Sequence, residues 1–239
     1  MVKLLELFSG TGSVGKVCKK LGWEVVSVDM LLPADHQVDI MDFDYKQYDK
    51  DEFTYIWGSP PCVAYSKLKD CWLGQRLKDG QIFTKEQMDK DMVEADKLVK
   101  KTLEIIDYFN CKWWFMENPQ TGKLKDREII KGLNFYDVDY CKYCDWGYKK
   151  PTRIWTNRTD FIPLRCLKDC ENMIVIPTDG AIRHDTKKPI KSQFRKLHSN
   201  QLCKSETLRA LRNHDKGKGS NKLDRYRIPE KLIFSLFNK

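Results

Sequence analysis

The chain has 239 residues, with 43 basic and 34 acidic side chains and a formal net charge of +9. This length allows one sizeable core plus a small appended region, and 12% aromatic residues argue against a disordered chain. No apolar stretch reaches the ~20 residues that cross a membrane, and residues 1–8 lack a secretory signal. The nine cysteines form no compact framework, so we expect an intracellular protein with reduced thiols. The basic charge fits either a polyanionic partner or a merely lysine-rich surface.

Strands and helices alternate along the first two thirds of the chain. Hydrophobic patterning predicts strands over residues 4–8, 24–29, 55–57, 112–116, 135–140 and 154–156, and helices over 13–21 and 85–109. This order predicts an α/β fold with a parallel sheet covered on both faces. Ligands of such sheets bind beyond the carboxyl ends of the strands. The residues that follow predicted strands there are Gly10, Asp29, Cys62 and Glu117.

The character of the chain changes after Asn157. Residues 158–222 are basic and mostly loop-like, with one possible short helix over 205–214. Residues 226–237 are apolar again, and Pro229 fits the first turn of a closing helix. We therefore expect three parts, with bounds at 1–157, 158–222 and 223–239.

A glycine-rich turn joins the first predicted strand to the first helix. Its pattern is Gly10-x-Gly12-x-x-Gly15, and Asp29 lies at the end of the next strand. Glycines let a ligand approach the backbone closely, and a carboxylate in that place can bind ribose hydroxyls. The pattern fits a nicotinamide dinucleotide or adenosylmethionine, which share an adenosine half. A tight turn without a ligand is the structural alternative, and the turn alone does not choose the cofactor.

A cysteine and a glutamate narrow the choice. Pro60 and Pro61 stiffen the approach to Cys62, whereas Cys18 and Cys111 fit ordinary buried positions. Aromatic residues 113–115 precede the glutamate of FMENPQTG; their apolar surroundings would raise its pKa and favour the protonated acid. The alternative is that Glu117 is an ordinary acid at the end of a strand, paired with a lysine. Addition of a thiolate at C6 of cytosine makes C5 nucleophilic enough to take a methyl group, and an acid at N3 spreads the developing charge.

Three motifs in order resemble those of the cytosine-C5 DNA methyltransferases. LELFSGTGSVG resembles the first motif of that family, GSPPCVAYS its nucleophile loop and FMENP its glutamate-asparagine motif. The matching segments are spread over residues 4–156; the Pro-Pro-Cys and Glu-Asn pair is specific, whereas the glycine turn is not. The resemblance implies a Rossmann-like methyltransferase sheet with helices on both faces, S-adenosylmethionine as methyl donor, and a base flipped out of double-stranded DNA.

The resemblance also implies roles for the three parts of the chain. Residues 1–157 would be the S-adenosylmethionine-dependent catalytic domain, 158–222 a small basic target-recognition region, and 223–239 a helix that returns to the catalytic domain. We expect a monomer without membrane contact. It would act in the cytoplasm or nucleoid, or in a nucleus or viral factory if its source is eukaryotic or viral.

The catalytic roles follow from matching positions in these motifs. The resemblance implies Cys62 as the covalent nucleophile and Glu117 as the acid at N3. It implies that Arg153, in the strand PTRIWTN, touches the cytosine carbonyl. Ser66 falls in the mobile loop that would close over the base.

The cofactor roles come from the same matches. The resemblance implies Asp29 on the ribose, Met30 against the adenine and Asp39-Ile40 near the adenine amino group. The other implied cofactor residues belong to the glycine turn and the nucleophile loop: Phe8, Ser9, Gly10, Thr11, Gly12 and Pro60.

The sequence departs from the family pattern in three places. Pro119 stands where the family usually has valine after Glu-Asn, and it favours an extended Asn118. Pro151 replaces the usual first arginine of the later strand, which predicts one anion contact fewer. Residues 225–229 resemble the closing motif only loosely. The short recognition region predicts a short target sequence or a weak sequence preference.

Four cysteines and a histidine form a possible metal site. Cys141-x2-Cys144 precedes Cys166-x3-Cys170, with His184 further on. Zinc favours such ligands, but the segment 145–165 between the pairs slightly exceeds the usual spacing. We therefore favour ordinary thiols and predict no bound metal.

Three other functions compete with DNA cytosine methylation. The same chemistry on RNA is the nearest, because the tRNA-methylating relatives of these enzymes also have a short recognition region. Methylation of free pyrimidine nucleotides is disfavoured by the basic region. A non-catalytic DNA-binding protein with the same fold is compatible with the departures. A dinucleotide oxidoreductase would share the glycine turn but gives no role to Pro60-Pro61-Cys62.

Overall fold

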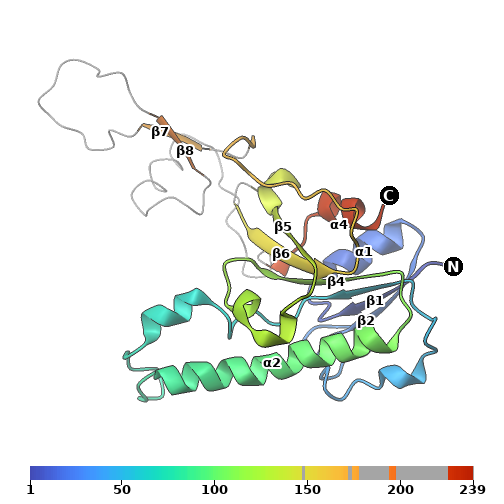
Figure 1. The fold of residues 1–239 in the computed structure, drawn as a ribbon, viewed down its shortest axis with the longest axis horizontal. Coiled ribbons are helices and arrows are strands. Elements are labelled where there is room, and N and C mark those ends of the chain that lie inside the picture. Colours follow the sequence, from blue (N-terminus) through green and yellow to red (C-terminus); the bar gives the residue numbers. More distant parts are fainter. Residues whose placement is uncertain (147–148, 172–173, 178–193, 198–225, 239) are drawn as a thin grey trace, which may run out of the picture.

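The computed structural model describes residues 1–146, 149–171, 174–177, 194–197 and 226–238. A six-stranded sheet in the order β2-β1-β3-β4-β6-β5 forms its centre (Figure 1). The strands are β1 (Lys3–Leu7), β2 (Glu24–Val28), β3 (Tyr55–Gly58), β4 (Trp113–Pro119), β5 (Phe135–Asp139) and β6 (Pro151–Thr156). A separate antiparallel pair consists of β7 (Ile174–Pro177) and β8 (Phe194–Leu197).

In the described part of the chain, three α-helices and five short 3-10 helices accompany the sheet. The α-helices are α1 (Ser13–Lys20), α2 (Lys85–Tyr108) and α4 (Glu230–Phe237). The 3-10 helices are η1 (Tyr45–Gln47), η2 (Lys67–Trp72), η3 (Leu124–Asp126), η4 (Glu128–Ile130) and η5 (Tyr140–Lys142). Among the described residues, no helix combines the length and apolar character needed to cross a membrane.

The direction of β6 differs from the expectation of a parallel sheet. Strands β2, β1, β3 and β4 are parallel, whereas β6 runs antiparallel between β4 and β5. The expectation is therefore confirmed for the first four strands and wrong for β6. A parallel crossover needs a dozen or more residues, usually including a helix. The connection spans only residues 140–150, and its described residues include η5 but no α-helix. The chain therefore returns in the opposite direction.

Different helices cover the two faces of the sheet, because successive strand residues point to opposite faces. On one face, Leu4, Tyr55 and Trp57 pack in a core cluster with α1 and α4. On the other face, Leu5 and Ile56 pack in a cluster with α2. Figure 1 shows α2 along one side of the sheet and α1 with α4 on the other. This arrangement confirms the α/β class, with a Rossmann-like sheet covered by helices on both faces.

A buried acid fastens the start of α1 to the sheet. The carboxyl oxygens of Glu6, on β1, accept hydrogen bonds from the amides of Val14 and Gly15 at 3.2 and 3.0 Å. These amides belong to the first turn of α1, where helical N–H groups lack partners within the helix. Burial raises the pKa of Glu6 to about 7. The glycine turn that precedes α1 is thereby held at a fixed place beyond β1.

The chain stays packed against the core for some residues beyond Asn157. The buried guanidinium of Arg158 donates to the main-chain oxygens of Ser235 and Leu236 at 3.2 and 2.6 Å. Helix α4 begins directly after Pro229, where the sequence predicts a helix, and it packs in the same cluster as α1. The predicted short helix over 205–214 and most of the basic region lie outside the described residues.

Candidate active site

The turn between β1 and α1 depends on backbone conformations that favour glycine. Gly10 and Gly12 have φ angles of 53° and 66°, which glycine adopts at little cost. The Gly12 amide donates to the carbonyl oxygen of Ser9 at 2.7 Å. Phe8 has a φ of 55°, which is uncommon for a residue with a side chain. The half-buried Thr11 completes the turn at the carboxyl end of β1.

Asp29 joins this turn to the loop that follows β2. Its Oδ2 atom accepts a hydrogen bond from the Gly10 amide at 2.8 Å, and its Oδ1 atom accepts from the amides of Leu31 and Leu32, both at 2.8 Å. A carboxylate offers about four lone-pair positions, so Asp29 can also accept a hydrogen bond from a ribose hydroxyl. The next side chain, Met30, is 55% exposed and is available to a flat ring.

The space beside the glycine turn suits a nucleoside cofactor. Among the described residues, a Cβ added to Gly10 would meet only the Phe8 carbonyl oxygen, at 3.9 Å, and one added to Gly12 only the end of the Lys16 side chain, at 3.8 Å. The protein itself therefore leaves room where a ligand would approach the backbone. Ile40 is buried with the ends of β1 and β2, so Asp39 lies at the same edge of the sheet.

The nucleophile loop after β3 is pinned by β4 and α2. Asn118, on β4, donates from Nδ2 to the carbonyl oxygen of Pro60 at 2.9 Å. The amide of Tyr65 donates to the carbonyl oxygen of Cys62 at 3.1 Å. The Tyr65 side chain is buried, and its hydroxyl donates to Asp96 on α2 at 2.9 Å. Cys62 itself is half-buried.

The segment after this loop begins with a capped 3-10 helix. The hydroxyl oxygen of Ser66 accepts a hydrogen bond from the Leu68 amide at 3.3 Å, at the start of η2. The side chains of Leu68 and Trp72 on η2 are exposed. The movement of this segment over a base stays a prediction.

Glu117 lies within β4, although the sequence predicted a strand that ends before it. Antiparallel pairing with β6 extends β4 as far as Pro119, and this partner is not visible in the sequence of β4. Glu117 is only 7% exposed. Its Oε1 atom accepts a hydrogen bond from the Tyr140 hydroxyl at 3.1 Å and lies 3.7 Å from the Nζ atom of Lys150.

Cys62 and Glu117 interact electrostatically. Burial raises the pKa of the Cys62 thiol, and the negative charge of Glu117 raises it further, whereas the positive charge of Lys150 lowers it. Only the thiolate is a strong nucleophile. The charge of Lys150 therefore favours formation of the Cys62 thiolate, and the charge of Glu117 opposes it.

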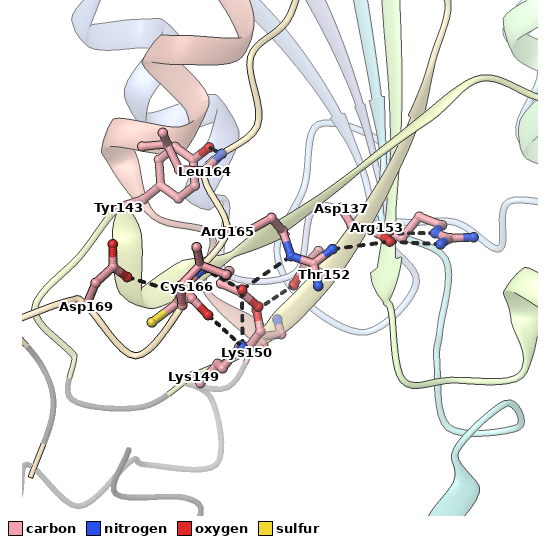
Figure 2. Close-up of polar contacts among 12 residues, drawn as sticks. Asp137, Tyr143, Lys149, Lys150, Thr152, Arg153, Leu164, Arg165, Cys166 and Asp169 are labelled. Atoms are coloured by element: carbon pink, nitrogen blue, oxygen red, sulfur yellow. Dashed lines mark hydrogen bonds and ion pairs between the residues drawn. The ribbon is translucent and has the colours of Figure 1, made fainter. Parts of the chain in front are cut away.

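Arg153 does not join this group. It pairs with Asn118 in the register of β4 and β6, so it is one residue out of phase with Glu117 and points to the other face of the sheet. Its guanidinium donates to the Asp137 carboxylate at 2.7 and 2.9 Å (Figure 2). It also lies 3.6 Å from the centre of the Phe135 ring. The contact of Arg153 with a base carbonyl stays a prediction.

Sequence reasoning missed two residues of the site. Tyr140 and Lys150 belong to the connection between β5 and β6, and the Lys150 Nζ atom lies 4.7 Å from the centre of the Tyr140 ring. No motif marks either residue. The one available signal was Pro151, which stands where an arginine was expected. Lys150, directly before it, places a positive charge beside Glu117.

Comparisons with known proteins identify the family. No protein-family model matches the sequence. A probable DNA (cytosine-5)-methyltransferase of Frog virus 3 (isolate Goorha) is 40% identical over 188 residues, which cover 77% of this chain and 84% of that protein. Similar solved structures include the Entamoeba histolytica methyltransferase EhMeth, with a TM-score of 0.48 and 14% identity over 68% of this chain and 56% of that one. The S. pombe Dnmt2 methyltransferase has a TM-score of 0.40 and 12% identity over 69% of this chain and 51% of that one.

This chain spans about half the length of those two structures, and such likenesses are too weak to support a function. The match to the viral protein is different, because it is long in both chains and has high identity. A relative of this similarity shows that the chain belongs to the DNA (cytosine-5)-methyltransferase family, whose methyl donor is S-adenosylmethionine.

Proposed function

We propose that this protein methylates C5 of cytosine in double-stranded DNA, with S-adenosylmethionine as donor and Cys62 as covalent nucleophile. The observation that supports this most is the electrostatic coupling of Cys62 with Glu117 and Lys150. This group lies at the carboxyl ends of β3 and β4, at the same edge of the sheet as the glycine turn. A protein that only bound DNA would need no such coupling.

The cysteine overcomes the low reactivity of cytosine. The Cys62 thiolate forms a bond to C6, which turns the ring into an enamine whose C5 attacks an electrophilic methyl group. When bound, S-adenosylmethionine would supply that methyl group from its sulfonium ion, whose bond to the methyl breaks so that a neutral thioether leaves. The C5 proton then leaves to a base, the bond between the Cys62 sulfur and C6 breaks, and the thiolate is restored with methylated cytosine.

The glutamate supports the same step by moving a proton. Glu117 donates a proton to N3 of the ring as Cys62 adds to C6, and takes it back when the sulfur leaves. A protonated Glu117 also ceases to raise the pKa of Cys62, so the acid and the thiolate are favoured together. The Tyr140 hydroxyl orients the carboxyl group, and Lys150 favours the thiolate.

We also assign the parts of the chain by function. Residues 1–157 carry the cofactor and the chemistry, residues 158–222 recognise the target, and residues 223–239 return to the catalytic domain. The packing of α4 in one cluster with α1 supports the last assignment. The basic charge of the middle part supports contacts to DNA phosphates, and the protein acts as a monomer.

A parallel labelling experiment tests this function. The protein is incubated with methyl-labelled S-adenosylmethionine and, separately, with duplex DNA, RNA and dCMP. We expect label only in DNA, at C5 of cytosine. Label in RNA or in dCMP would assign the same chemistry to that substrate instead. DNA binding without any label would indicate a non-catalytic relative.

Salt dependence tests the role of the recognition region. Lys216 and Lys218 lie outside the described residues, in the stretch Lys216-Gly-Lys218-Gly-Ser220. Phosphate contacts release counterions, with a log–log slope near −0.9 per neutralised phosphate. Neutralising both lysines should weaken binding to all sequences alike and flatten the slope. The matched control neutralises Lys97 and Lys100 on α2, and equal slopes in all three proteins would exclude these phosphate contacts.

A further inference from the structure

Three cysteine thiols outside the candidate active site converge on one point. The Sγ atoms of Cys141, Cys166 and Cys170 all lie within 4.8 Å of one another. Thiolates bound to one tetrahedral zinc ion at about 2.3 Å have sulfur atoms about 3.8 Å apart. A disulfide would join only two sulfurs, at about 2 Å. Three converging thiols therefore suit a shared ion better than one covalent bond.

The segments that carry these thiols are joined by hydrogen bonds that involve Asp139, Tyr143 and Leu164. Asp139, the last residue of β5, is buried, and its Oδ2 atom accepts a hydrogen bond from the Cys166 amide at 2.8 Å. Its own amide donates to the Leu164 carbonyl oxygen at 3.1 Å, and the Leu164 amide donates to the Tyr143 hydroxyl at 2.8 Å. Figure 2 shows Tyr143, Leu164 and Cys166 in this arrangement. Cys166 is thus fixed close to Cys141.

The turn between the second pair of cysteines is shaped to bring both of them inward. Lys168, between Cys166 and Cys170, has a φ of 64°, a conformation that a residue with a side chain adopts only when its surroundings impose it. Asp169 forms an ion pair with Lys142 on η5 at 2.9 Å. A metal ion bound by both Cys166 and Cys170, which flank Lys168, would impose such a turn.

We propose that Cys141, Cys166 and Cys170 bind one structural zinc ion together with Cys144. Cys144 is half-buried three residues after Cys141, and its Sγ atom donates to the Tyr140 carbonyl oxygen at 3.1 Å. On binding, the four thiols release their protons to solvent, and each sulfur donates an electron pair to the ion. The Cys-x2-Cys and Cys-x3-Cys spacings match those of zinc sites. This proposal replaces the expectation of ordinary thiols drawn from spacing alone.

The ion would stabilise the segment that contacts Glu117 in the candidate active site. Tyr140, which donates a hydrogen bond to Glu117, directly precedes Cys141. Cys166 and Cys170 lie in the first part of the basic region, residues 158–222. Zinc would therefore fix the position of the Tyr140 hydroxyl and the start of the recognition region together. This consequence rests on the proposed function, whereas the zinc content of the protein does not.

Metal analysis of the full chain tests the proposal. The protein is purified under reducing conditions without chelators, and its zinc is measured by mass spectrometry. We expect one zinc ion per chain, and loss of most of it in Cys141→Ser and Cys166→Ser. Cys71→Ser, which changes an exposed cysteine on η2, is the matched control and should keep its zinc. X-ray absorption of the wild-type protein, which requires no variant to fold, should show four sulfur neighbours at about 2.3 Å.

Three outcomes would overturn the proposal. The first is wild-type protein without zinc that takes up no added Zn²⁺. The second is a disulfide among the three converging cysteines, seen as a mass lower by two hydrogens before reduction. The third is an X-ray absorption spectrum with three sulfur neighbours and one nitrogen neighbour, in which the nitrogen is lost in His184→Ala. His184 would then be the fourth ligand instead of Cys144.

Discussion

The candidate active site has two halves that are built in different ways. The cofactor half would hold S-adenosylmethionine, and the base half would hold the target cytosine. In the cofactor half, the Gly10 amide donates to Asp29, and main-chain hydrogen bonds define a shape. In the base half, Cys62, Glu117 and Lys150 come from three separate segments and are coupled by charge. We therefore expect changes in the first half to alter binding and stability. Changes in the second half should alter the rate and its pH dependence.

The largest effect should follow from removing the carboxyl group of Glu117, in the half of the site that would hold the target cytosine. Glu117→Gln keeps the size of the side chain but cannot donate a proton to N3. General acids contribute roughly 10²–10⁴-fold to rates, so kcat should fall by about that factor while cofactor affinity stays unchanged. Single-turnover methylation and calorimetry measure the two quantities. Glu128→Gln, an exposed glutamate on η4, is the control, and a fully active Glu117→Gln would place the acid elsewhere.

The next effect concerns the buried acid that fixes the cofactor half. The pKa of Glu6 is raised from 4.5 to about 7 in the folded protein, so folding favours its protonated form. Its contribution to stability is complete below pH 4.5 and is lost as the pH rises through 7. One pKa unit corresponds to about 1.4 kcal/mol, so the loss should be about 3 kcal/mol.

Urea denaturation of wild type and Glu6→Gln at several pH values between 4.5 and 8 measures this loss. As the pH rises, the free energy of unfolding of the glutamine variant should increase relative to that of wild type. Carboxylates with lowered pKa values, such as Asp35 and Asp91, titrate in both proteins and cancel. If the difference in the free energy of unfolding between the two proteins did not change with pH, folding would not raise the pKa of Glu6.

A smaller effect is expected for the carboxylate of the cofactor half. Charge-assisted hydrogen bonds contribute roughly 1.5–3 kcal/mol each, and about 1.4 kcal/mol is one decade in affinity. Asp29→Ala should therefore weaken S-adenosylmethionine binding at least tenfold. Asp35→Ala is the control, because this neighbouring carboxylate bonds only Ser27 among the described residues. Calorimetry that finds equal affinities would remove Asp29 from the site.

The smallest effect should come from the lysine of the base half. Lys150→Met removes the charge that lowers the pKa of Cys62. The pH at which kcat/KM reaches half its maximum should therefore move upward, so the rate near neutral pH should fall more than the rate at high pH. Lys131→Met, whose partner is the exposed Glu128, is the control. A fall in rate at all pH values without a shift would indicate a structural role for Lys150.

The same contrast explains which features the sequence could predict. The glycine turn, Asp29 and helix α1 were predicted because a few neighbouring residues determine them. Helix α2 was predicted over 85–109 and spans Lys85–Tyr108, because its apolar side chains recur at helical spacing. Cys62 and Glu117 were found because the sequence places each of them just after a predicted strand.

The features that the sequence did not predict depend on partners far along the chain. Strand β4 extends to Pro119 and β6 runs antiparallel because these two strands pair with each other. That pairing also turns Arg153 away from Glu117. Tyr140 and Lys150 reach Glu117 only after the β5–β6 connection has folded back over the sheet edge. No local pattern encodes such contacts.

Covalent trapping tests the central claim most directly. Duplex DNA with 5-fluorocytosine at its target positions is incubated with S-adenosylmethionine and the protein, because fluorine at C5 blocks release of Cys62 after methyl transfer. We predict a stable protein–DNA adduct for wild type and for Cys71→Ser. Cys62→Ser should form no adduct yet bind the cofactor with nearly unchanged affinity. Absence of the adduct in wild type, or its persistence in Cys62→Ser, would contradict the assignment of Cys62 as the nucleophile.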